Sequence, residues 1–399
     1  MRPLPLVDDR ALASLGRQTS FFVDLDILEK NLADMRAIIG PGVRLAAVIK
    51  ADAYGHGALP VARLLAEKGV DILAVATLSE GIELRKALPQ TEILVMGHTP
   101  GYLMPLAVRD HLDLTIFDLE SARILSSLAP KDRNAHVHIK LDTGMNRLGI
   151  KAYEKPAELI AEIAALPGIE IRGVFTHLAL RNRESDMEQF ALFERILKEL
   201  ERLGVDPGLR HICDSIGTVR YPEFRMDMVR VGAALFGVRP FRMGPEYDAY
   251  HFPQVGSFLT RIARLRFISE GEMVSYDDSW KAPPGGSLIA TLPVGYADGY
   301  PRQFANKGYV LIRGKKAPVV GLVCMDQLMV DASGIEGARE GDEVLLFGGQ
   351  GIDLAEASSW ASLNRNALLC GIGKRVPRIY KRNDRLVEPG AASAGAEVS

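Results

Sequence analysis

The sequence predicts an α/β fold, a (β/α)8 TIM-like barrel followed by a mostly β C-terminal domain. Between residues 44 and 232, eight short apolar runs alternate with amphipathic segments, whereas beyond about residue 252 the runs are separated by glycines. Eight strands that are each followed by a helix is the count of a closed parallel barrel. Short runs between turn residues are typical of a β domain. A chain of 399 residues is long enough for two such domains.

The predicted barrel strands are short and apolar, as strands buried on both faces are. They cover 44–49, 72–76, 93–96, 112–117, 136–141, 171–176, 211–213 and 228–231. Helices are predicted between them, for example at 60–68, which has a proline at its start and Gly69 after its end. A second helix is predicted at 187–203, where large apolar side chains recur on one face.

The second domain is predicted from strand-like runs at 257–268, 286–293, 308–312 and 343–347, followed by a helical segment at 355–369. We therefore assign residues 27–250 to the barrel and 251–385 to the β-rich domain. The remaining residues, 386–399, are rich in Gly, Ala and Ser, and we expect a disordered tail there.

Composition points to a small-molecule partner. Lys and Arg total 48 and Asp and Glu total 50, so a net charge of −2 provides no field for nucleic acid or an anionic membrane. No apolar run reaches membrane-spanning length, and the first residues lack the pattern of a secretory signal. Cys213, Cys324 and Cys370 form no CxxC pair, which suits a reducing cytoplasm and offers no structural zinc site. We expect all three to be small buried hydrophobes.

Chemically capable side chains follow the predicted strands at their carboxyl ends, where barrel active sites are built. They are Lys50 after the first strand, Lys140 and Asp142 after the fifth, His177 after the sixth, Ser215 after the seventh and Gly232 after the eighth. Barrels commonly bind phosphate after strands seven and eight. The sequence therefore predicts one site at this rim for a phosphate-bearing ligand.

Lys50 stands out because an apolar strand delivers it into a glycine-rich turn, in the segment AVIKADAYGHG at 47–57. Loss of solvation lowers the pKa of such an ammonium, and the neutral amine can form a Schiff base or accept a proton. Tyr54, Gly55 and Gly57 would offer a hydroxyl and backbone N–H groups to an anion. Taken alone, a lysine that closes a strand is more often a solvated end residue.

This segment resembles the cofactor-lysine motif of the alanine racemases, barrel-type fold III enzymes that carry pyridoxal 5′-phosphate (PLP). The likeness runs from about residue 19 to 380. It implies that Lys50 binds PLP covalently and is one of two catalytic bases, and that an N-terminal strand at 19–26 joins the β domain. The other cofactor contacts that it implies are Tyr54, Ser215, Gly232 and Ala233 for the phosphate, Arg230 for the pyridine nitrogen, and His211.

A second match is KLDTGMNRLG at 140–149. It implies that Arg147 holds the substrate carboxylate and the phenolic oxygen of the cofactor, and that Lys140 is a lysine often carbamylated to orient that arginine. A carbamate attracts an arginine, whereas an ammonium repels it. Without the resemblance, Lys140 and Arg147 are read as solvated loop charges.

The third group of matches lies in the second domain, at 273–276, 293–300 and 321–327. The resemblance implies that Tyr276 is the base on the opposite face of the substrate. It also implies that Met325 offers its backbone N–H to the substrate carboxylate and that Asp326 shapes the entrance. In relatives these segments come from the partner subunit, so a homodimer with shared sites is implied. Without the family, Tyr276 is an ordinary surface ring.

Together these matches imply an alanine racemase that interconverts L- and D-alanine by a two-base mechanism. Lys50 would act on the α-proton of the D-isomer and Tyr276 on that of the L-isomer, with His177 and Arg230 supporting the tyrosine. His177 can also be read as a core histidine satisfied by a backbone carbonyl. No metal is called for. The sequence leaves open whether D-alanine is made for cell-wall precursors or broken down.

Several residues depart from the family pattern. Asp214 replaces the usual asparagine, Asp277 the glycine after the catalytic tyrosine, and Lys374 a phosphate-binding tyrosine of some relatives. Leu-Arg-Asn at 180–182 replaces small and acidic residues. These changes leave open a broader amino-acid racemase, acting on serine or other substrates.

Three other functions are alternatives to a racemase. A PLP-dependent decarboxylase shares the architecture, but the chain lacks the glycine triplet of that family. A non-catalytic PLP carrier would lack the second domain. A barrel enzyme that forms a Schiff base between Lys50 and a sugar phosphate remains a third alternative.

Overall fold

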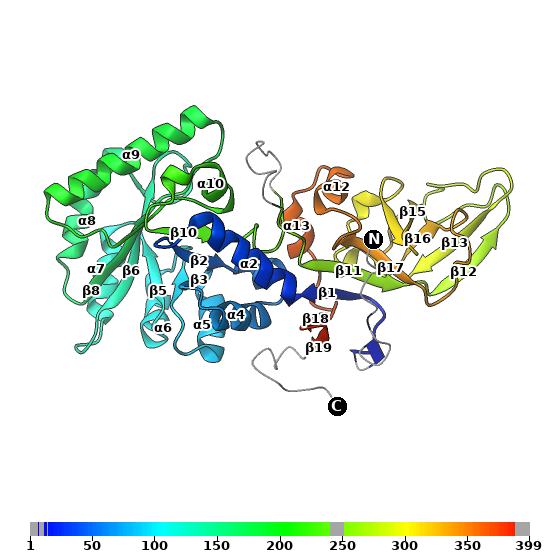
Figure 1. Ribbon diagram of the computed structural model, residues 1–399, viewed down its shortest axis with the longest axis horizontal. Coiled ribbons are helices and arrows are strands. Elements are labelled where there is room, and N and C mark those ends of the chain that lie inside the picture. The colour runs from blue at the N-terminus through cyan, green and yellow to red at the C-terminus, as the bar shows by residue number, and fades with distance from the viewer. Residues whose placement is uncertain (1–6, 8–11, 14, 240–250, 388–399) are drawn as a thin grey trace.

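The computed structural model describes residues 7, 12–13, 15–239 and 251–387. A barrel of strands with surrounding helices occupies one end of the molecule, and a β-sheet domain occupies the other (Figure 1). Strands β1 (Ser20–Asp24), β11 (Gly256–Arg261) and β18 (Arg378–Arg382) lie between the two ends of the view. Much of the predicted tail, from residue 388 onward, lies outside the described residues.

All eight predicted barrel strands are present. They are β2 (Arg44–Val48), β3 (Ile72–Val75), β4 (Ile93–Val95), β5 (Asp113–Ile116), β6 (Ala135–Asp142), β8 (Ile169–Phe175), β9 (Leu209–His211) and β10 (Met228–Val231). They pair in parallel in the order β10-β2-β3-β4-β5-β6-β8-β9. The Arg230 N–H donates to the Cys213 carbonyl at 3.0 Å, which links the last strand to the segment after β9 and nearly closes the barrel.

Helices cover the outside of the barrel. They are α2 (Leu25–Ile39), α4 (Ala58–Glu67), α5 (Leu78–Ala87), α6 (Met104–Arg109), α7 (Leu119–Leu128), α8 (Pro156–Ala164), α9 (Arg183–Arg202) and α10 (Ser215–Arg220). In α9 the Asn182 side chain caps the start and accepts from Ser185 N, while Phe193, Ile196 and Leu200 are buried. Over the described residues, no helix combines the length and apolar character needed to cross a membrane.

The second sheet runs β12-β13-β16-β15-β14-β17-β11-β1-β18-β19. Its other strands are β12 (Arg264–Ile268), β13 (Ser287–Leu292), β14 (Tyr309–Ile312), β15 (Lys315–Val320), β16 (Leu328–Asp331), β17 (Glu343–Gly348) and β19 (Arg385–Val387). The N-terminal strand β1 lies inside this sheet, with Phe21 opposite Phe258 of β11 and Arg378 of β18. The chain then enters α2, whose first N–H groups are capped by Asp24.

Two expected elements are each divided. The run 257–268 forms β11 and β12, which lie far apart in the sheet order. The helical segment 355–369 forms α12 (Leu354–Ser359) and α13 (Arg365–Cys370), because Ser362 has a φ of 53° and Asn364 caps a new helix. The expectation for the cysteines was also wrong in part, since Cys213 is buried but Cys370 is exposed.

Candidate active site

A cavity of about 710 Å³ opens at the carboxyl ends of the barrel strands. Nine of the predicted site residues line it, and so does Asp214: the nine are Lys50, Tyr54, Lys140, Arg147, His177, Ser215, Arg230, Gly232 and Ala233. Residues 362–366, which lead from α12 into the first turn of α13, line it from the second domain. Side chains from distant parts of the sequence therefore share one cavity.

Lys50 begins α3 (Lys50–Tyr54), a short turn that departs from ordinary helical geometry. Ala51, Asp52, Ala53 and Tyr54 have φ values of 53–55°, in the left-handed region. For ordinary L-residues this conformation costs roughly 1–2 kcal/mol each, so other contacts must hold the turn. Its backbone bonds include Ala53 N to Ile49 O and Gly55 N to Ala51 O, both 2.9 Å.

Two carboxylates hold this turn in place, one from Asp52 within it and one from Glu80 outside it. Asp52 accepts from Ala58 N at 2.6 Å, and Glu80 accepts from Ala51 N at 2.7 Å. Glu80 also accepts from Thr77 N as part of the capping box of α5. The start of α5 thus fixes the turn that carries Lys50 and Tyr54.

Lys50 is poised to be a neutral amine. Burial lowers its pKa below the ordinary value, and the charge of Arg147 lowers it further, while Glu80 opposes the shift. A neutral amine can attack a carbonyl carbon or accept a proton, which a protonated lysine cannot.

Tyr54, Ser215 and Gly232 form a cradle of hydroxyl and backbone N–H groups. The Gly232 N–H and the Ala234 N–H point to Ser215 Oγ at 3.1 and 3.3 Å. A Cβ on Gly232 would lie 2.5 Å from the Tyr54 hydroxyl, so glycine allows the close approach of Tyr54. Burial raises the pKa of Tyr54, which keeps its hydroxyl protonated. Neutral donors of this kind suit a phosphate.

Asp214 caps α10 beside this cradle. Its Oδ1 accepts from Ile216 N at 3.0 Å and from Gly217 N at 2.9 Å. Burial raises the pKa of Asp214, and the Gly217 N–H opposes that rise. The aspartate that departs from the family pattern is therefore used locally, in ordering the turn that presents Ser215.

Arg230 is buried and donates through both terminal nitrogens. Nη2 donates to Thr176 O at 2.7 Å and lies 3.2 Å from His177 Nδ1, and Nη1 lies 2.9 Å from His211 Nδ1. Burial lowers the pKa of Arg230 to about 10. His211 lies behind the arginine and is fully buried, so it supports the cavity without lining it.

Lys140 is 7% exposed, so it is not a solvated loop charge. Its Nζ donates to Leu141 O at 2.8 Å and lies 5.0 Å from the centre of the Phe175 ring. Burial, then the charge of Arg230, lowers the pKa of Lys140 well below its ordinary value. Arg147 follows in the next turn, where it is exposed at the cavity wall.

Tyr276, Met325 and Asp326 are absent from the lining of this cavity. All three are exposed on the second domain, with Tyr276 66% accessible in a turn after β12. Asp277, which follows it, has a φ of 61°, where glycine is the freer residue. Lys374 is exposed and is likewise not part of the cavity lining.

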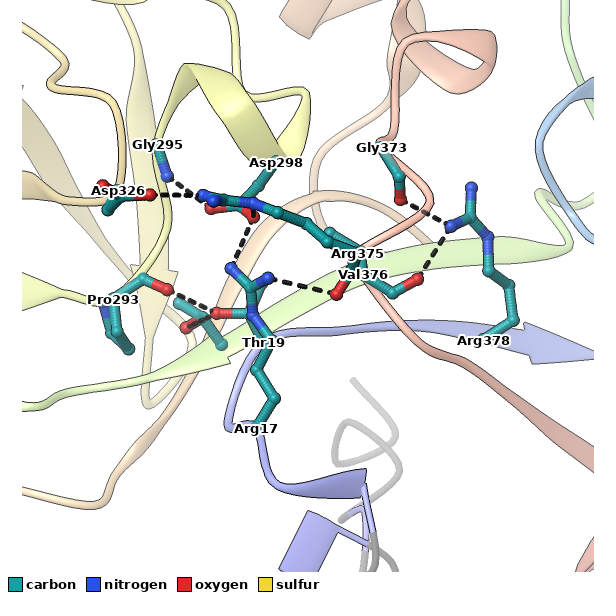
Figure 2. A network of polar contacts seen from close by, with 11 residues as sticks. Arg17, Thr19, Pro293, Gly295, Asp298, Asp326, Gly373, Arg375, Val376 and Arg378 are labelled. Atoms are coloured by element: carbon teal, nitrogen blue, oxygen red, sulfur yellow. Dashed lines mark hydrogen bonds and ion pairs between the residues drawn. The ribbon is translucent and has the colours of Figure 1, made fainter.

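Asp326 belongs to a polar network centred on Asp298 (Figure 2). Arg375 donates to Asp298 and to Asp326, each at 2.6 Å, and Arg17 forms a short ion pair with Asp298. The Asp298 side chain is fully buried and also accepts from Gly295 N. This network links the Met325–Asp326 segment to Arg17, shortly before β1.

The sequence reading missed the contribution of Asn364, Arg365 and Asn366 to the cavity. A local signal could have found them, because asparagine is a favoured N-cap residue. The Asn364 Oδ1 accepts from Asn366 N at 2.8 Å. A predicted break at Asn364 would have placed a helix start there.

This chain is similar to known proteins in both sequence and structure. The family model "Alanine racemase, N-terminal domain" matches residues 23–240, and "Alanine racemase, C-terminal domain" matches 255–380. The alanine racemase of Desulforamulus reducens is 37% identical over 362 residues, which cover 90% of this chain and 97% of the relative.

Two solved structures are also similar. The alanine racemase from Bacillus anthracis with bound L-Ala-P has a TM-score of 0.86 and 31% identity, covering 93% of this chain and 97% of that one. The Bartonella henselae alanine racemase with covalently bound pyridoxal phosphate has a TM-score of 0.82 and 28% identity, covering 91% and 99%.

Proposed function

This chain belongs to the alanine racemase family, and from that premise we propose that Lys50 and Tyr276 are the two bases of its reaction. The protein is an alanine racemase, an isomerase that interconverts L- and D-alanine, and its cofactor is pyridoxal 5′-phosphate. The observation that carries the assignment of residues is the convergence of Lys50, Tyr54, Ser215 and Arg230 on one cavity.

The cavity fits the cofactor. Tyr54, Ser215 and the Gly232 backbone would hold the phosphate, Ala233 would add to this cradle, and Lys50 would bind the aldehyde carbon. When bound, the cofactor draws electron density from the substrate and so acidifies the α-hydrogen. Because both terminal nitrogens of Arg230 already donate to interior acceptors, Nε is the donor left for the pyridine nitrogen.

Lys50 would exchange the α-proton on one face of the substrate. Its lowered pKa leaves a larger fraction of neutral amine than an ordinary lysine has, and the neutral amine accepts a proton. We assign to it the α-proton of D-alanine.

Tyr276 would act on the opposite face, for L-alanine. Since it does not line the cavity of its own chain, we propose that a second copy supplies it, together with Met325 and Asp326. This homodimer is supported by the exposed Tyr276, Tyr296 and Met325, which are 66%, 43% and 54% accessible and would otherwise leave apolar surface in water.

His177 would lower the cost of deprotonating this tyrosine. Arg230 only donates, so the nearby His177 Nδ1 is an acceptor and its Nε2 carries the hydrogen. Burial and the charge of Arg230 lower the pKa of His177 well below its ordinary value, so the ring stays neutral. A neutral Nε2–H can donate to a phenolate oxygen.

Arg147 would bind the substrate carboxylate, and we propose that Lys140 is carbamylated to orient it. The lowered pKa of Lys140 favours the neutral amine, which is the form that adds to CO2. A carbamate would also place an anion near the buried charge of Arg230, which disfavours a cation at Lys140.

Proton NMR of the PLP-loaded enzyme with L-alanine in D2O, combined with a chiral assay, tests the function. We expect deuterium at the α-carbon and accumulation of D-alanine, and loss of both in Lys50→Ala. L-Serine in the same assay measures substrate breadth. Unchanged L-alanine with bound cofactor would overturn the assignment.

Mixing two inactive variants tests the shared site. In a heterodimer of Lys50→Ala and Tyr276→Phe, one site carries both defects and the other carries neither. Activity should therefore reappear on mixing, and no recovery from subunits that exchange would reject the contribution of Tyr276 in trans.

We also propose a cytoplasmic location, in keeping with cysteines that are free among the described residues.

A further inference from the structure

A chain of buried polar side chains leads from Arg230 through the barrel interior to its other end. His211 Nε2 lies 2.9 Å from His138 Nδ1, and His138 Nε2 lies 3.8 Å from Asp113 Oδ2. Together with the contact from Arg230 to His211, this chain crosses β10, β9, β6 and β5. Asp113 is the first residue of β5, at the amino ends of the strands and opposite the active site.

The direction of every hydrogen in this chain follows from Arg230. A guanidinium has no acceptor, so His211 Nδ1 must accept, and a neutral His211 then carries its hydrogen on Nε2. That hydrogen points to His138 Nδ1, which must accept in turn. The hydrogen of His138 therefore lies on Nε2, which makes no hydrogen bond and faces the Asp113 carboxylate across 3.8 Å.

Burial supports neutral rings at both positions. His138 and His211 are fully buried, and burial is the main cause that lowers the pKa of His138 to about 4 and that of His211 well below its ordinary value. A protonated His211 would turn a hydrogen toward Arg230, and the contact would become repulsive.

The space around His138 is shaped for this ring. His138 lies opposite Gly173 in the pairing of β6 with β8, and a Cβ on Gly173 would lie 2.6 Å from His138 Nδ1. Phe175 stacks on His211, with ring centres 4.7 Å apart and planes inclined by 4°. Neither ring can turn over without moving the strands around it.

We propose that His138 and His211 form a one-way hydrogen-bond chain that positions Arg230 for the cofactor, with the charge of Asp113 facing the end of the chain. The inference rests on the proposed function of Arg230 at the pyridine nitrogen. The neutral ring of His211 accepts from Nη1 and holds it in place. The Asp113 carboxylate at the far end favours this direction of the chain without forming an ion pair with the guanidinium of Arg230. Asp113, His138 and His211 are positioning residues, because they act through Arg230.

NMR of 15N-histidine-labelled, PLP-loaded enzyme tests the direction of the chain. We expect His138 and His211, assigned with His138→Gln and His211→Gln, to be neutral with hydrogen on Nε2. A doubly protonated ring or hydrogen on Nδ1 at either position would overturn the proposal. This readout needs no activity, so it distinguishes failure of the chain from failure of the racemase assignment, which the alanine assay reports.

Kinetics of Asp113→Leu test the consequence. Loss of the terminal negative charge should lower kcat about tenfold, the effect of about 1.4 kcal/mol at the transition state, with KM for alanine within about twofold because Arg230 does not hold the substrate. The cofactor absorption band should shift in the same variant. Asp113→Glu, which keeps the negative charge, should recover most of kcat, and Asp132→Asn, in an exposed loop, is the control. Wild-type kcat and spectrum in Asp113→Leu would overturn the proposal.

Discussion

The Tyr54 hydroxyl lies where a side chain on Gly232 would be, 2.5 Å from the Cβ that this position lacks. A residue of the left-handed turn after β2 and a residue just after β10 are thus fitted to each other at the ends of two neighbouring strands. The first prediction follows from this contact.

Gly232→Ala should weaken cofactor binding. The added methyl group displaces the Tyr54 hydroxyl, and overpacking of this kind costs about 1–3 kcal/mol. PLP titration followed by absorbance should show a correspondingly higher dissociation constant. Gly334→Ala is the matched control, because its Cβ would meet no atom within 4 Å. Equal affinity in the two variants would contradict the phosphate cradle.

Tyr276→Phe should separate the two halves of the reaction. Without the phenol, the α-proton of L-alanine should no longer exchange with D2O, whereas Lys50 should still exchange that of D-alanine. Proton NMR of each isomer measures the two rates. Tyr153→Phe, 82% exposed, should exchange both isomers as wild type does. Undiminished exchange of L-alanine in Tyr276→Phe would reassign the second base.

A carbamate on Lys140 should be detectable with labelled CO2. Enzyme equilibrated with 13C-bicarbonate should give one slowly exchanging carbamate resonance, because the buried amine is protected from solvent. Lys140→Gln should lack the resonance and bind alanine with a higher KM, since Arg147 would lose its partner. A spectrum that is the same in both proteins would remove the modification from the site.

Asp298→Ala should be among the more destabilising changes in the second domain. It removes the buried partner of Arg17 and Arg375, whose own side chains are 24% and 42% exposed, so water reaches them and the loss should be about 1–3 kcal/mol. Differential scanning fluorimetry should record a clear drop in Tm. Asp384→Ala, whose side chain is 95% exposed, should change Tm little. A small drop for Asp298→Ala would mean that water replaces the network.

His56 should make the fold sensitive to acid. Burial lowers its pKa to about 4, so the folded state stays uncharged while the unfolded chain takes up a proton below pH 6.5. Its contribution is complete above pH 6.5 and falls by about 1.4 kcal/mol per pH unit as the pH drops toward 4.

The comparison is between Tm values of wild type and His56→Leu from pH 7 to pH 4.5. Leucine loses the contact to Ala53 O and some stability at pH 7, but the gap should narrow on acidification. If the Tm difference between the two proteins does not change with pH, the pKa of His56 does not differ between the folded and unfolded states.

The barrel could be predicted because eight buried strands leave an apolar pattern that local reading detects. The division of 257–268 could not, since the chain leaves β11 beside β1 and starts β12 at the opposite end of the sheet, and only tertiary pairing reveals this. Four consecutive non-glycine residues from Ala51 to Tyr54 in left-handed conformation also contradict local preference.

Part of the candidate site could be predicted as well, because it follows from the predicted barrel. Side chains at strand ends converge in any barrel, so Lys50, His177 and Ser215 were predictable, whereas Tyr276 depended on the family resemblance. His138 and Asp113 were not singled out, because polar residues within a strand ordinarily indicate a solvent-facing side. Their burial follows from barrel closure, which a single strand does not encode.

Strand β1 has a consequence for synthesis on the ribosome. It is complete by residue 24, but its partners β11 and β18 begin only at residues 256 and 378. Throughout translation of the barrel, both edges of an apolar strand await neighbours that do not yet exist, and such edges invite aggregation. A nascent chain that stalls after the barrel should therefore depend on a chaperone, and the barrel cut free of its second domain should be a poor expression target.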